Sequence, residues 1–459
     1  MISVKQKYIT IIPCILVLLI ITALGVINLK SYYEEILNST GLVHKDFFQK
    51  LKEENERAIE SDVAYQRMID YLLQDSNGDR EQSEDITYPL TTAEENGNAV
   101  ENDKQQSLSL RANAALLLDA ENNRVLYEKN GYKKLAMAST TKIMTCIVAL
   151  ENADPMSVVT ISSYAASMPD VQLNARKGEQ FYLGDLLYSL MLESHNDVAV
   201  AIAEHVGGTV QGFAAMMNKK AKELGCADTN FVTPNGLDAD GHYTTARDLA
   251  VIASYAIKNQ KFIEITNAAN HSFKEIKSGR GFTVSNKNRF LYMMDGAIGV
   301  KTGFTGDAGY CFVGAIKRTD RTLVSVVLGC GWPPNKSLKW SDTKELMSYG
   351  VENYEERQIF RDVDLEPVFV EDGQEKYEYL NMEGSLTLLM REDEKVKIVY
   401  QVPRSLKAPV KQGDLVGSAK YYIDEVLYAE VPIYTTTGIA KIDYPYCLKE
   451  ILKMWGAKY

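Results

Sequence analysis

Ser139 and Lys142 lie three residues apart at the start of an apolar run, in the stretch ASTTKIMT (138–145). A serine hydroxyl is a poor nucleophile at neutral pH and needs a base within hydrogen-bond reach. If residues 139–150 (STTKIMTCIVAL) form a helix, the i, i+3 spacing places both side chains on one face, one turn apart. The pattern therefore fits a serine nucleophile activated by a lysine. It also fits the commoner arrangement of a helix N-cap serine followed by a solvated lysine.

Two short motifs further along the chain favour the first interpretation. Ser194-His195-Asn196 lies in LESHNDVA, and Lys301-Thr302-Gly303 lies in GVKTGFT on a predicted strand. Each tripeptide alone is a weak signal. Following Ser-x-x-Lys in this order, however, they form the signature of penicillin-binding proteins and class A β-lactamases. We expect His195 to be a spacer, because the middle position of Ser-x-Asn does not need an ionisable group.

Longer stretches resemble the D-alanyl-D-alanine carboxypeptidases, the low-molecular-mass penicillin-binding proteins of the bacterial envelope. These stretches are NAALLLDAENNRVLYEKN, AMASTTKIMT, ELGCADTNFVTPNGLDADGHYTTARDLA and GAIGVKTGFTGDAGYCFVGA. The resemblance covers residues 112–354 and continues more faintly through a C-terminal β-domain, which that family also carries. It implies a serine peptidase of cell-wall synthesis and cell shape, which removes the terminal D-alanine from peptidoglycan stem pentapeptides. It also implies covalent binding of β-lactam antibiotics and no cofactor.

The resemblance implies a role for each motif residue in acyl transfer. Ser139 would be the nucleophile. Lys142, with its pKa lowered by Lys301 and by partial desolvation, would accept the serine proton. Ser194 would pass that proton to the leaving nitrogen, and Asn196 would hold the substrate amide and the lysine.

The Lys-Thr-Gly strand would bind the substrate. Lys301 and Thr302, followed by Gly303, would meet the terminal carboxylate. The backbone N–H groups of Ser139 and Phe304 would form the oxyanion hole, in which one donor is typically worth about 3 to 4 kcal/mol. We expect the stretch NFVTPNGLDADGHYTT (230–245) to be loop architecture, and Thr305 either to touch the carboxylate or to fill a turn.

Two other functions compete with this one. A class A β-lactamase needs a Glu-x-x-Leu-Asn pattern between the second and third motifs, and none occurs between Asn196 and Lys301. The similar stretch DVQLN (170–174) lies upstream of Ser194. A non-catalytic sensor that binds penicillin or peptidoglycan is the second alternative, but all the polar groups named above are present.

The order of the predicted elements indicates an α+β fold. A hairpin at residues 114–130 is followed by helical patterns at 139–265, including one at 183–206 and one at 210–225, by strands from residue 297 and by a helix at 341–354. One sheet would thus be built from both ends of the segment. The resemblance implies the fold of serine DD-peptidases and β-lactamases, an antiparallel sheet with helices on both faces and a helical subdomain. Short alternating strands from about residue 362 indicate a small all-β domain.

We expect five segments along the chain. They are a membrane anchor or signal peptide (1–30), a charged helix and acidic tether (31–106), the catalytic domain (107–360), the β-domain (361–440) and an amphipathic C-terminal helix (441–459). Residues 8–29 carry no charge and are long enough to span a bilayer, and the lysines at 5 and 7 favour a cytoplasmic N-terminus. This predicts a protein of the cell membrane whose catalytic domain is extracytoplasmic.

Composition excludes several other classes of function. The net charge of −11 provides no basic surface for nucleic acid. The six cysteines lack the short paired spacings of a zinc site or disulfide framework, and H-E-x-x-H is absent, so we expect no metal. We expect each cysteine after the N-terminal segment to be a small buried residue.

Overall fold

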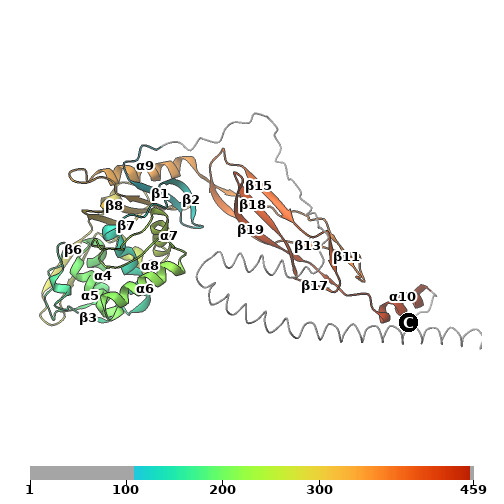
Figure 1. Cartoon of the computed structure of the whole chain (residues 1–459), viewed down its shortest axis with the longest axis horizontal. Coiled ribbons are helices and arrows are strands. Elements are labelled where there is room, and N and C mark those ends of the chain that lie inside the picture. Colours follow the sequence, from blue (N-terminus) through green and yellow to red (C-terminus); the bar gives the residue numbers. More distant parts are fainter. Residues whose placement is uncertain (1–107, 455–459) are drawn as a thin grey trace, which may run out of the picture. The chain divides into compact units, whose positions relative to one another are not determined.

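The computed structural model describes residues 108–454 (Figure 1). The predicted membrane segment at 8–29 and the predicted tether at 31–106 lie outside the described residues. No helix within 108–454 is long and apolar enough to cross a membrane.

A five-stranded antiparallel sheet holds together the two ends of the catalytic region. Its strand order is β2-β1-β9-β8-β7. The strands are β1 (Ala114–Asp119), β2 (Arg124–Lys129), β7 (Ala297–Thr305), β8 (Gly309–Lys317) and β9 (Thr322–Leu328). Pairing of β1 with β9 joins the first hairpin to the last three strands, which confirms the predicted sheet and the α+β class. The Lys-Thr-Gly strand β7 lies at one edge.

Helices cover both faces of this sheet. One face packs against α9 (Leu338–Asn353), and the other packs against α7 (Ala246–Ala256) and α8 (Gln260–Asn267). All six residues of β1 are buried, and the five apolar ones, 114–118, alternate between two hydrophobic clusters, with Leu116 in one and Leu117 in the other. A strand covered on both faces reads as a continuous apolar run for this reason.

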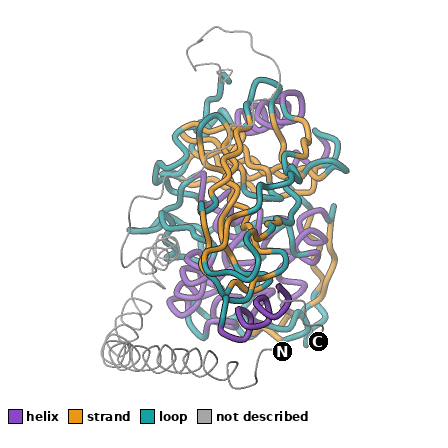
Figure 2. Tube along the Cα trace, turned by 90° about the vertical axis from the view of Figure 1, so that its right-hand side faces the viewer, coloured by secondary structure: helices purple, strands orange, loops and turns teal. Residues whose placement is uncertain are grey.

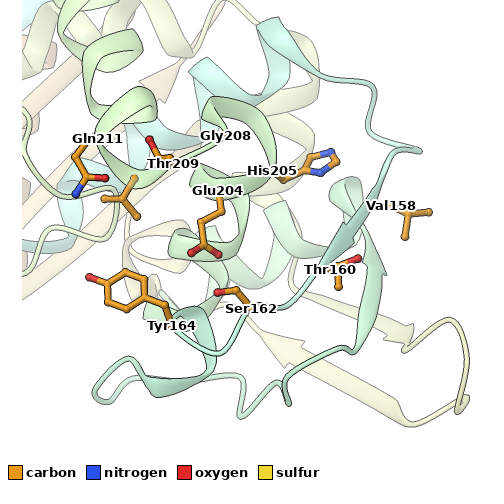
Figure 3. A pocket seen from close by; sticks show the side chains of 10 residues that line it. Val158, Thr160, Ser162, Tyr164, Glu204, His205, Gly208, Thr209 and Gln211 are labelled. Atoms are coloured by element: carbon orange, nitrogen blue, oxygen red, sulfur yellow. The ribbon is translucent and has the colours of Figure 1, made fainter.

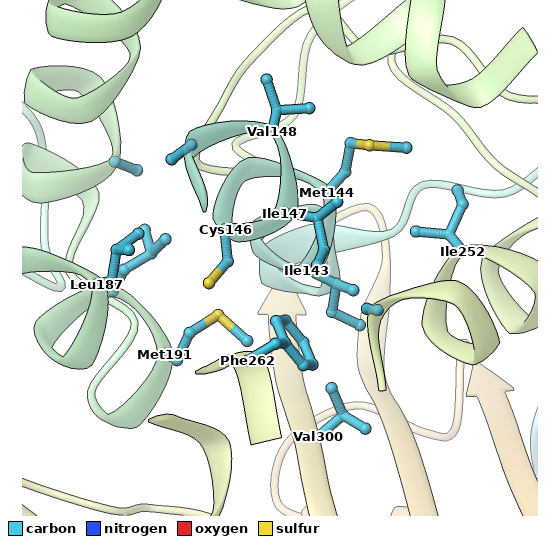
Figure 4. Close-up of a cluster of buried hydrophobic side chains, with 14 of the residues drawn as sticks. Ile143, Met144, Cys146, Ile147, Val148, Leu187, Met191, Ile252, Phe262 and Val300 are labelled. Atoms are coloured by element: carbon cyan, nitrogen blue, oxygen red, sulfur yellow. The ribbon is translucent and has the colours of Figure 1, made fainter. Parts of the chain in front are cut away.

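The helical subdomain is built around α3 (Lys142–Asn152). Residues Lys142 to Ala149 are all buried, because neighbouring helices surround α3. Figure 4 shows α3 side chains packing with residues from α4, α8 and β7. The other elements here are η1 (Ala138–Thr141), β3 (Val158–Thr160), η2 (Ala165–Ser167), β4 (Gln180–Tyr182), α4 (Leu183–Leu192), α5 (Asn196–Gly207) and α6 (Val210–Glu223).

Several local features differ from the sequence prediction. The helical pattern at 183–206 is broken, because α4 ends at Leu192 and α5 begins at Asn196. The hairpin of β5 (Asn270–Lys274) and β6 (Gly281–Ser285), followed by η3 (Arg289–Tyr292), was not anticipated. Cys447 is exposed, in contrast to the other four described cysteines, so the expectation of burial is wrong there.

The C-terminal region consists mainly of short strands, as predicted; several of them are labelled in Figure 1, and Figure 2 colours the strands of the described chain orange. The elements are β10 (Glu355–Gln358), β11 (Val368–Glu371), β12 (Tyr377–Glu378), β13 (Leu380–Asn381), β14 (Thr387–Met390), β15 (Val396–Gln401), β16 (Ser405–Lys407), β17 (Val410–Lys411), β18 (Leu415–Ile423), β19 (Val426–Thr435), β20 (Gly438–Ile439) and α10 (Tyr444–Met454). Strand β10 pairs with β14. It therefore belongs to the C-terminal sheet structure, although it lies within the segment 107–360 that we expected to be catalytic. Helix α10 has no buried residue.

Candidate active site

Ser139 and Lys142 face each other at the junction of η1 and α3. Lys142 Nζ lies 3.0 Å from Ser139 Oγ, as the i, i+3 spacing predicts. The lysine side chain is completely buried, and the N-cap of α3 is Thr141, whose side chain makes no capping bond. The simpler interpretation, a capping serine beside a solvated lysine, does not describe this geometry.

The surroundings of Lys142 favour a neutral amine. Burial, followed by the neighbouring positive charge of Lys301, lowers its pKa well below the ordinary lysine value, while Asp197 opposes the shift. Nζ also donates to Asn196 Oδ1 at 2.9 Å and to the Asn235 carbonyl at 2.5 Å. A lysine held in one position with a lowered pKa can accept a proton from the adjacent hydroxyl.

The break between α4 and α5 positions the Ser-x-Asn motif. Ser194 has a left-handed backbone (φ 72°), which brings the helical run to an end. Its Oγ is buried and has no hydrogen-bond partner in the described part of the chain. Asn196 opens α5, and its Nδ2 donates to the carbonyls of Pro169 and Asp170 at 3.1 Å each.

Strand β7 runs beside η1 and carries the third motif. Lys301 is 2% exposed, and burial lowers its pKa to about 7. A Cβ atom added to Gly303 would lie 3.0 Å from the Ser139 backbone nitrogen, so glycine permits the close approach of the strand. Thr302 is half-buried, and Phe304 is exposed with its ring 4.6 Å from that of Tyr310.

The loop at 230–242 contacts both η1 and α3, a contribution that the sequence did not reveal. Besides the Asn235 carbonyl on Lys142, the Pro234 carbonyl accepts a bond from Thr145 Oγ1 at 2.6 Å. His242 Nε2 lies 2.9 Å from Thr141 Oγ1, and burial lowers the pKa of this histidine to about 4. The contacts with Lys142 and Thr145 are made by backbone carbonyls, which every residue carries, so no residue type predicted them.

Two remaining side chains are engaged in other contacts. Thr305 Oγ1 donates to Asp238 Oδ1 at 2.7 Å and accepts from the Ala308 N–H at 3.2 Å, which fits the turn-filling alternative. His195 is not a mere spacer, because its Nδ1 lies 2.7 Å from Ser189 Oγ on α4.

A polar pocket of about 580 Å³ lies elsewhere, where α5 ends and α6 begins (Figure 3). It contains Glu204 and His205, two turns of helix beyond Asn196, and none of the motif residues. We assign it no catalytic part. Among residues 108–454, no group of three or more His, Cys, Asp and Glu side chains could hold a metal ion.

Comparison with known proteins agrees with this fold and motif set. Residues 99–331 match the D-alanyl-D-alanine carboxypeptidase family, and residues 354–441 match the C-terminal domain of penicillin-binding protein 5. The chain therefore belongs to the D-alanyl-D-alanine carboxypeptidase family.

Individual relatives span most of the described chain. D-alanyl-D-alanine carboxypeptidase DacF of Bacillus subtilis is 30% identical over 361 residues, covering 77% of this chain and 92% of its own. The structure of penicillin-binding protein 5 from Haemophilus influenzae is 26% identical with a TM-score of 0.62, covering 73% of this chain and 99% of its own. The structure of the Streptomyces K15 DD-transpeptidase is 32% identical with a TM-score of 0.51, covering 54% of this chain and 99% of its own.

Proposed function

We propose that this protein is a serine-type D-Ala-D-Ala carboxypeptidase. It removes the terminal D-alanine from peptidoglycan stem pentapeptides through an acyl-enzyme on Ser139, and β-lactams acylate the same serine. The observation that carries the proposal is the fully buried Lys142 Nζ, 3.0 Å from Ser139 Oγ. Membership of the carboxypeptidase family supports the substrate class.

Acylation begins at Ser139. Its Oγ attacks the carbonyl carbon of the penultimate D-alanine while the hydroxyl proton moves to Lys142 Nζ. This step needs the neutral amine, which burial and the charge of Lys301 favour. The new C–O bond replaces the peptide C–N bond, and the leaving nitrogen must gain a proton.

We assign delivery of that proton to Ser194. Its hydroxyl is buried and makes no hydrogen bond within the described residues, so it is free to bond to the substrate. Asn196 holds Lys142 through Oδ1 and is assigned to the substrate backbone amide.

The substrate binds along β7. Lys301 and Thr302 meet the terminal carboxylate, whose negative charge favours the protonated form of Lys301. The backbone N–H groups of Ser139 and Phe304 stabilise the developing oxyanion. Glycine at 303 supports this assignment, because a larger residue there would press on the Ser139 nitrogen.

Deacylation by water completes the cycle and releases the shortened peptide. With a β-lactam, the same acylation yields an ester that the site hydrolyses slowly. A β-lactamase needs a carboxylate to activate the water, but Asp197, the carboxylate that acts on Lys142, already accepts backbone N–H bonds from Leu173, Ala175 and Val198. This favours the peptidase over the lactamase.

We further propose that the enzyme acts in the cell envelope, with the uncharged segment at 8–29 as membrane anchor and residues 31–106 as tether to an extracytoplasmic catalytic domain. Peptidoglycan and β-lactams are then its extracytoplasmic partners. The amphipathic α10 is a weaker second contact with the membrane interface.

Release of D-alanine from a diacetyl-L-Lys-D-Ala-D-Ala tripeptide tests the proposal. We expect the portion 108–459 to release many equivalents per enzyme. Release of one equivalent or less, with stable penicillin labelling, would instead identify a sensor.

A further inference from the structure

His195, the middle residue of the Ser-x-Asn motif, is locked between two side chains. It is 4% exposed, and its Nδ1 lies 2.7 Å from Ser189 Oγ while its Nε2 lies 3.4 Å from Glu193 Oε2. Ser189 belongs to α4 and Glu193 caps its C-terminus, so both contacts tie the turn back to the helix before it. The backbone that leaves this turn is fixed as well, because the Asn196 N–H donates to the Val171 carbonyl at 2.7 Å.

Glu193 is itself held from another element. Its Oε1 accepts the Ser285 N–H at 2.9 Å and lies 3.2 Å from Lys287 Nζ, at the end of β6. Burial raises the pKa of Glu193, but these two bonds outweigh it and lower the pKa overall. The carboxylate is therefore ionised, and a continuous chain of contacts runs from the β5–β6 hairpin through Glu193 and His195 to α4.

These contacts favour one tautomer of His195. An ionised carboxylate can only accept hydrogen bonds, so a proton on Nε2 suits Glu193 at 3.4 Å, and in that tautomer Nδ1 accepts from the Ser189 hydroxyl. Burial lowers the pKa of His195, as do Lys142 and Lys301, against the opposing charges of Asp197 and Glu193. The imidazole ring is therefore neutral and held in one orientation.

Ser194 directly precedes His195, so the position of the ring bears on the position of Ser194. Ser194 has a left-handed backbone, and no hydrogen bond within residues 108–454 restrains its Oγ. Its position therefore depends on the residues on either side of it, Glu193 and His195. Both belong to the contact chain described above.

We propose that His195 is a positioning residue, which places the Ser194 hydroxyl for proton delivery through its contacts with Ser189 and Glu193. The inference rests on the proposed function, because it needs Ser194 to act on the leaving nitrogen. His195 does not touch the reacting atoms. Its effect is confined to the step in which Ser194 donates, so it acts on kcat and not on substrate binding.

Substitutions that copy one ring nitrogen at a time test the proposal. Asparagine places an amide atom where Nδ1 stood, and glutamine places one where Nε2 stood. We expect His195→Ala to lower kcat for the D-Ala-D-Ala tripeptide by about 10- to 100-fold, the effect of a small misplacement, with KM changed less than about threefold. His195→Asn should restore most of the rate, since the 2.7 Å bond to Ser189 is the shorter contact, and His195→Gln should restore less.

Two further variants keep the test decisive if His195→Ala does not fold. Ser189→Ala removes the same bond from the other side and should lower kcat in parallel. His205→Asn is the matched control, because its Nε2 lies 2.9 Å from Ser157 Oγ, also a histidine–serine contact, but in the last turn of α5 and outside the contact chain; it should keep the parental kcat.

Parental kcat in His195→Ala or, if that variant does not fold, in Ser189→Ala would overturn the inference, as would equal losses in kcat and substrate affinity with a lowered Tm and no rescue by asparagine. Failure of the proposed function looks different: Ser139→Ala would then keep its covalent penicillin label, whatever residue stands at 195.

Discussion

Two buried lysines share the site, and the proposed mechanism needs them in opposite charge states. Lys142 must be neutral to accept the serine proton, whereas Lys301 must be charged to meet a carboxylate. Burial lowers the pKa of both, to about 7 for Lys301, and the positive charge of Lys301 lowers the pKa of Lys142 as well. An arriving carboxylate favours the protonated form of Lys301, and the two opposite charges then largely cancel each other at Lys142. Burial therefore remains the main cause that favours the neutral form of Lys142.

The buried Lys301 also carries a cost in stability. Its pKa is about 7 in the folded protein against an ordinary value of 10.5, so between these pH values the unfolded chain binds a proton that the folded protein does not. The contribution of this group to the free energy of unfolding therefore rises with pH across that window, and below pH 7 the folded protein holds a buried cation.

Lys301→Gln should consequently lower the activity and raise the stability of the protein. We expect kcat/KM for the D-Ala-D-Ala tripeptide to fall at least about 100-fold, since a charge-assisted bond is lost. The Tm at pH 7 should rise by roughly 2–4 °C, because about 1 kcal/mol or more of desolvation cost is relieved. Scanning calorimetry from pH 6 to 10 checks the expected change in Tm. Between these pH values, Tm should rise less steeply with pH in Lys301→Gln than in the parent protein.

Lys219→Gln, on a lysine side chain that is 80% exposed, is the control and should leave both quantities unchanged. An unaltered Tm and pH slope in Lys301→Gln would show that the folded protein pays no such cost.

The placement of η1 depends on a glycine in the supporting loop. Gly236 has φ 81°, and a Cβ atom there would lie 2.0 Å from the Ala138 carbonyl, directly before Ser139. Gly241 in the same loop has a similar φ of 79°, but its Cβ would lie no closer than 3.6 Å to any other group. Both alanine substitutions carry the strain of a left-handed backbone, and only one displaces η1.

Gly236→Ala should therefore slow acylation by a fluorescent penicillin far more than Gly241→Ala does. We expect a loss of about 100-fold or more for the first, from displacement of the nucleophile, and a change of less than about threefold for the second. Each should lose about 1 kcal/mol of stability from backbone strain alone. Equal acylation rates in the two variants would mean that contact with Ala138 does not position Ser139.

Elements were predictable from sequence where the signal is local. The β1–β2 hairpin, the β7 to β9 strands and the contact of Ser139 with Lys142 all follow from short-range periodicity and spacing. The break before Asn196 was missed, because the apolar spacing of 183–206 continues through it and the left-handed Ser194 is not a glycine.

Long-range contacts made by the backbone were not predictable. The Asn235 carbonyl that binds Lys142 lies 93 residues away and would be available from any residue type. The contacts of His195 were not predictable for a similar reason, since its partners Ser189 and Glu193 follow from how α4 ends and not from a motif.

Attachment of the protein to the membrane involves both ends of the chain. Helix α10 exposes Leu448, Ile451 and Met454 on a stripe of about three turns, which is a small area for holding a protein on lipid. The uncharged segment at 8–29 is long enough to span a bilayer and insert almost irreversibly. The N-terminal segment should therefore provide most of the membrane attachment.

Deleting residues 449–459 should leave the protein in the membrane fraction, whereas replacing residues 1–29 by a cleavable signal should release most of it. Fractionation followed by immunoblotting checks both outcomes. N-terminal sequencing of the native protein checks the premise, because a mature terminus beyond Leu29 would identify a signal peptide and leave α10 as the anchor.

Peptide mapping of the penicillin-labelled protein tests the acyl-enzyme directly. After treatment with one equivalent of benzylpenicillin, mass spectrometry should find the added mass of one penicilloyl group on the peptide that contains Ser139. Ser139→Ala should carry no label, and Lys142→Ala should be labelled at least about 100 times more slowly, because the base is lost. A penicilloyl group on any other residue, or undiminished labelling of Ser139→Ala, would contradict the assignment of Ser139 as the nucleophile.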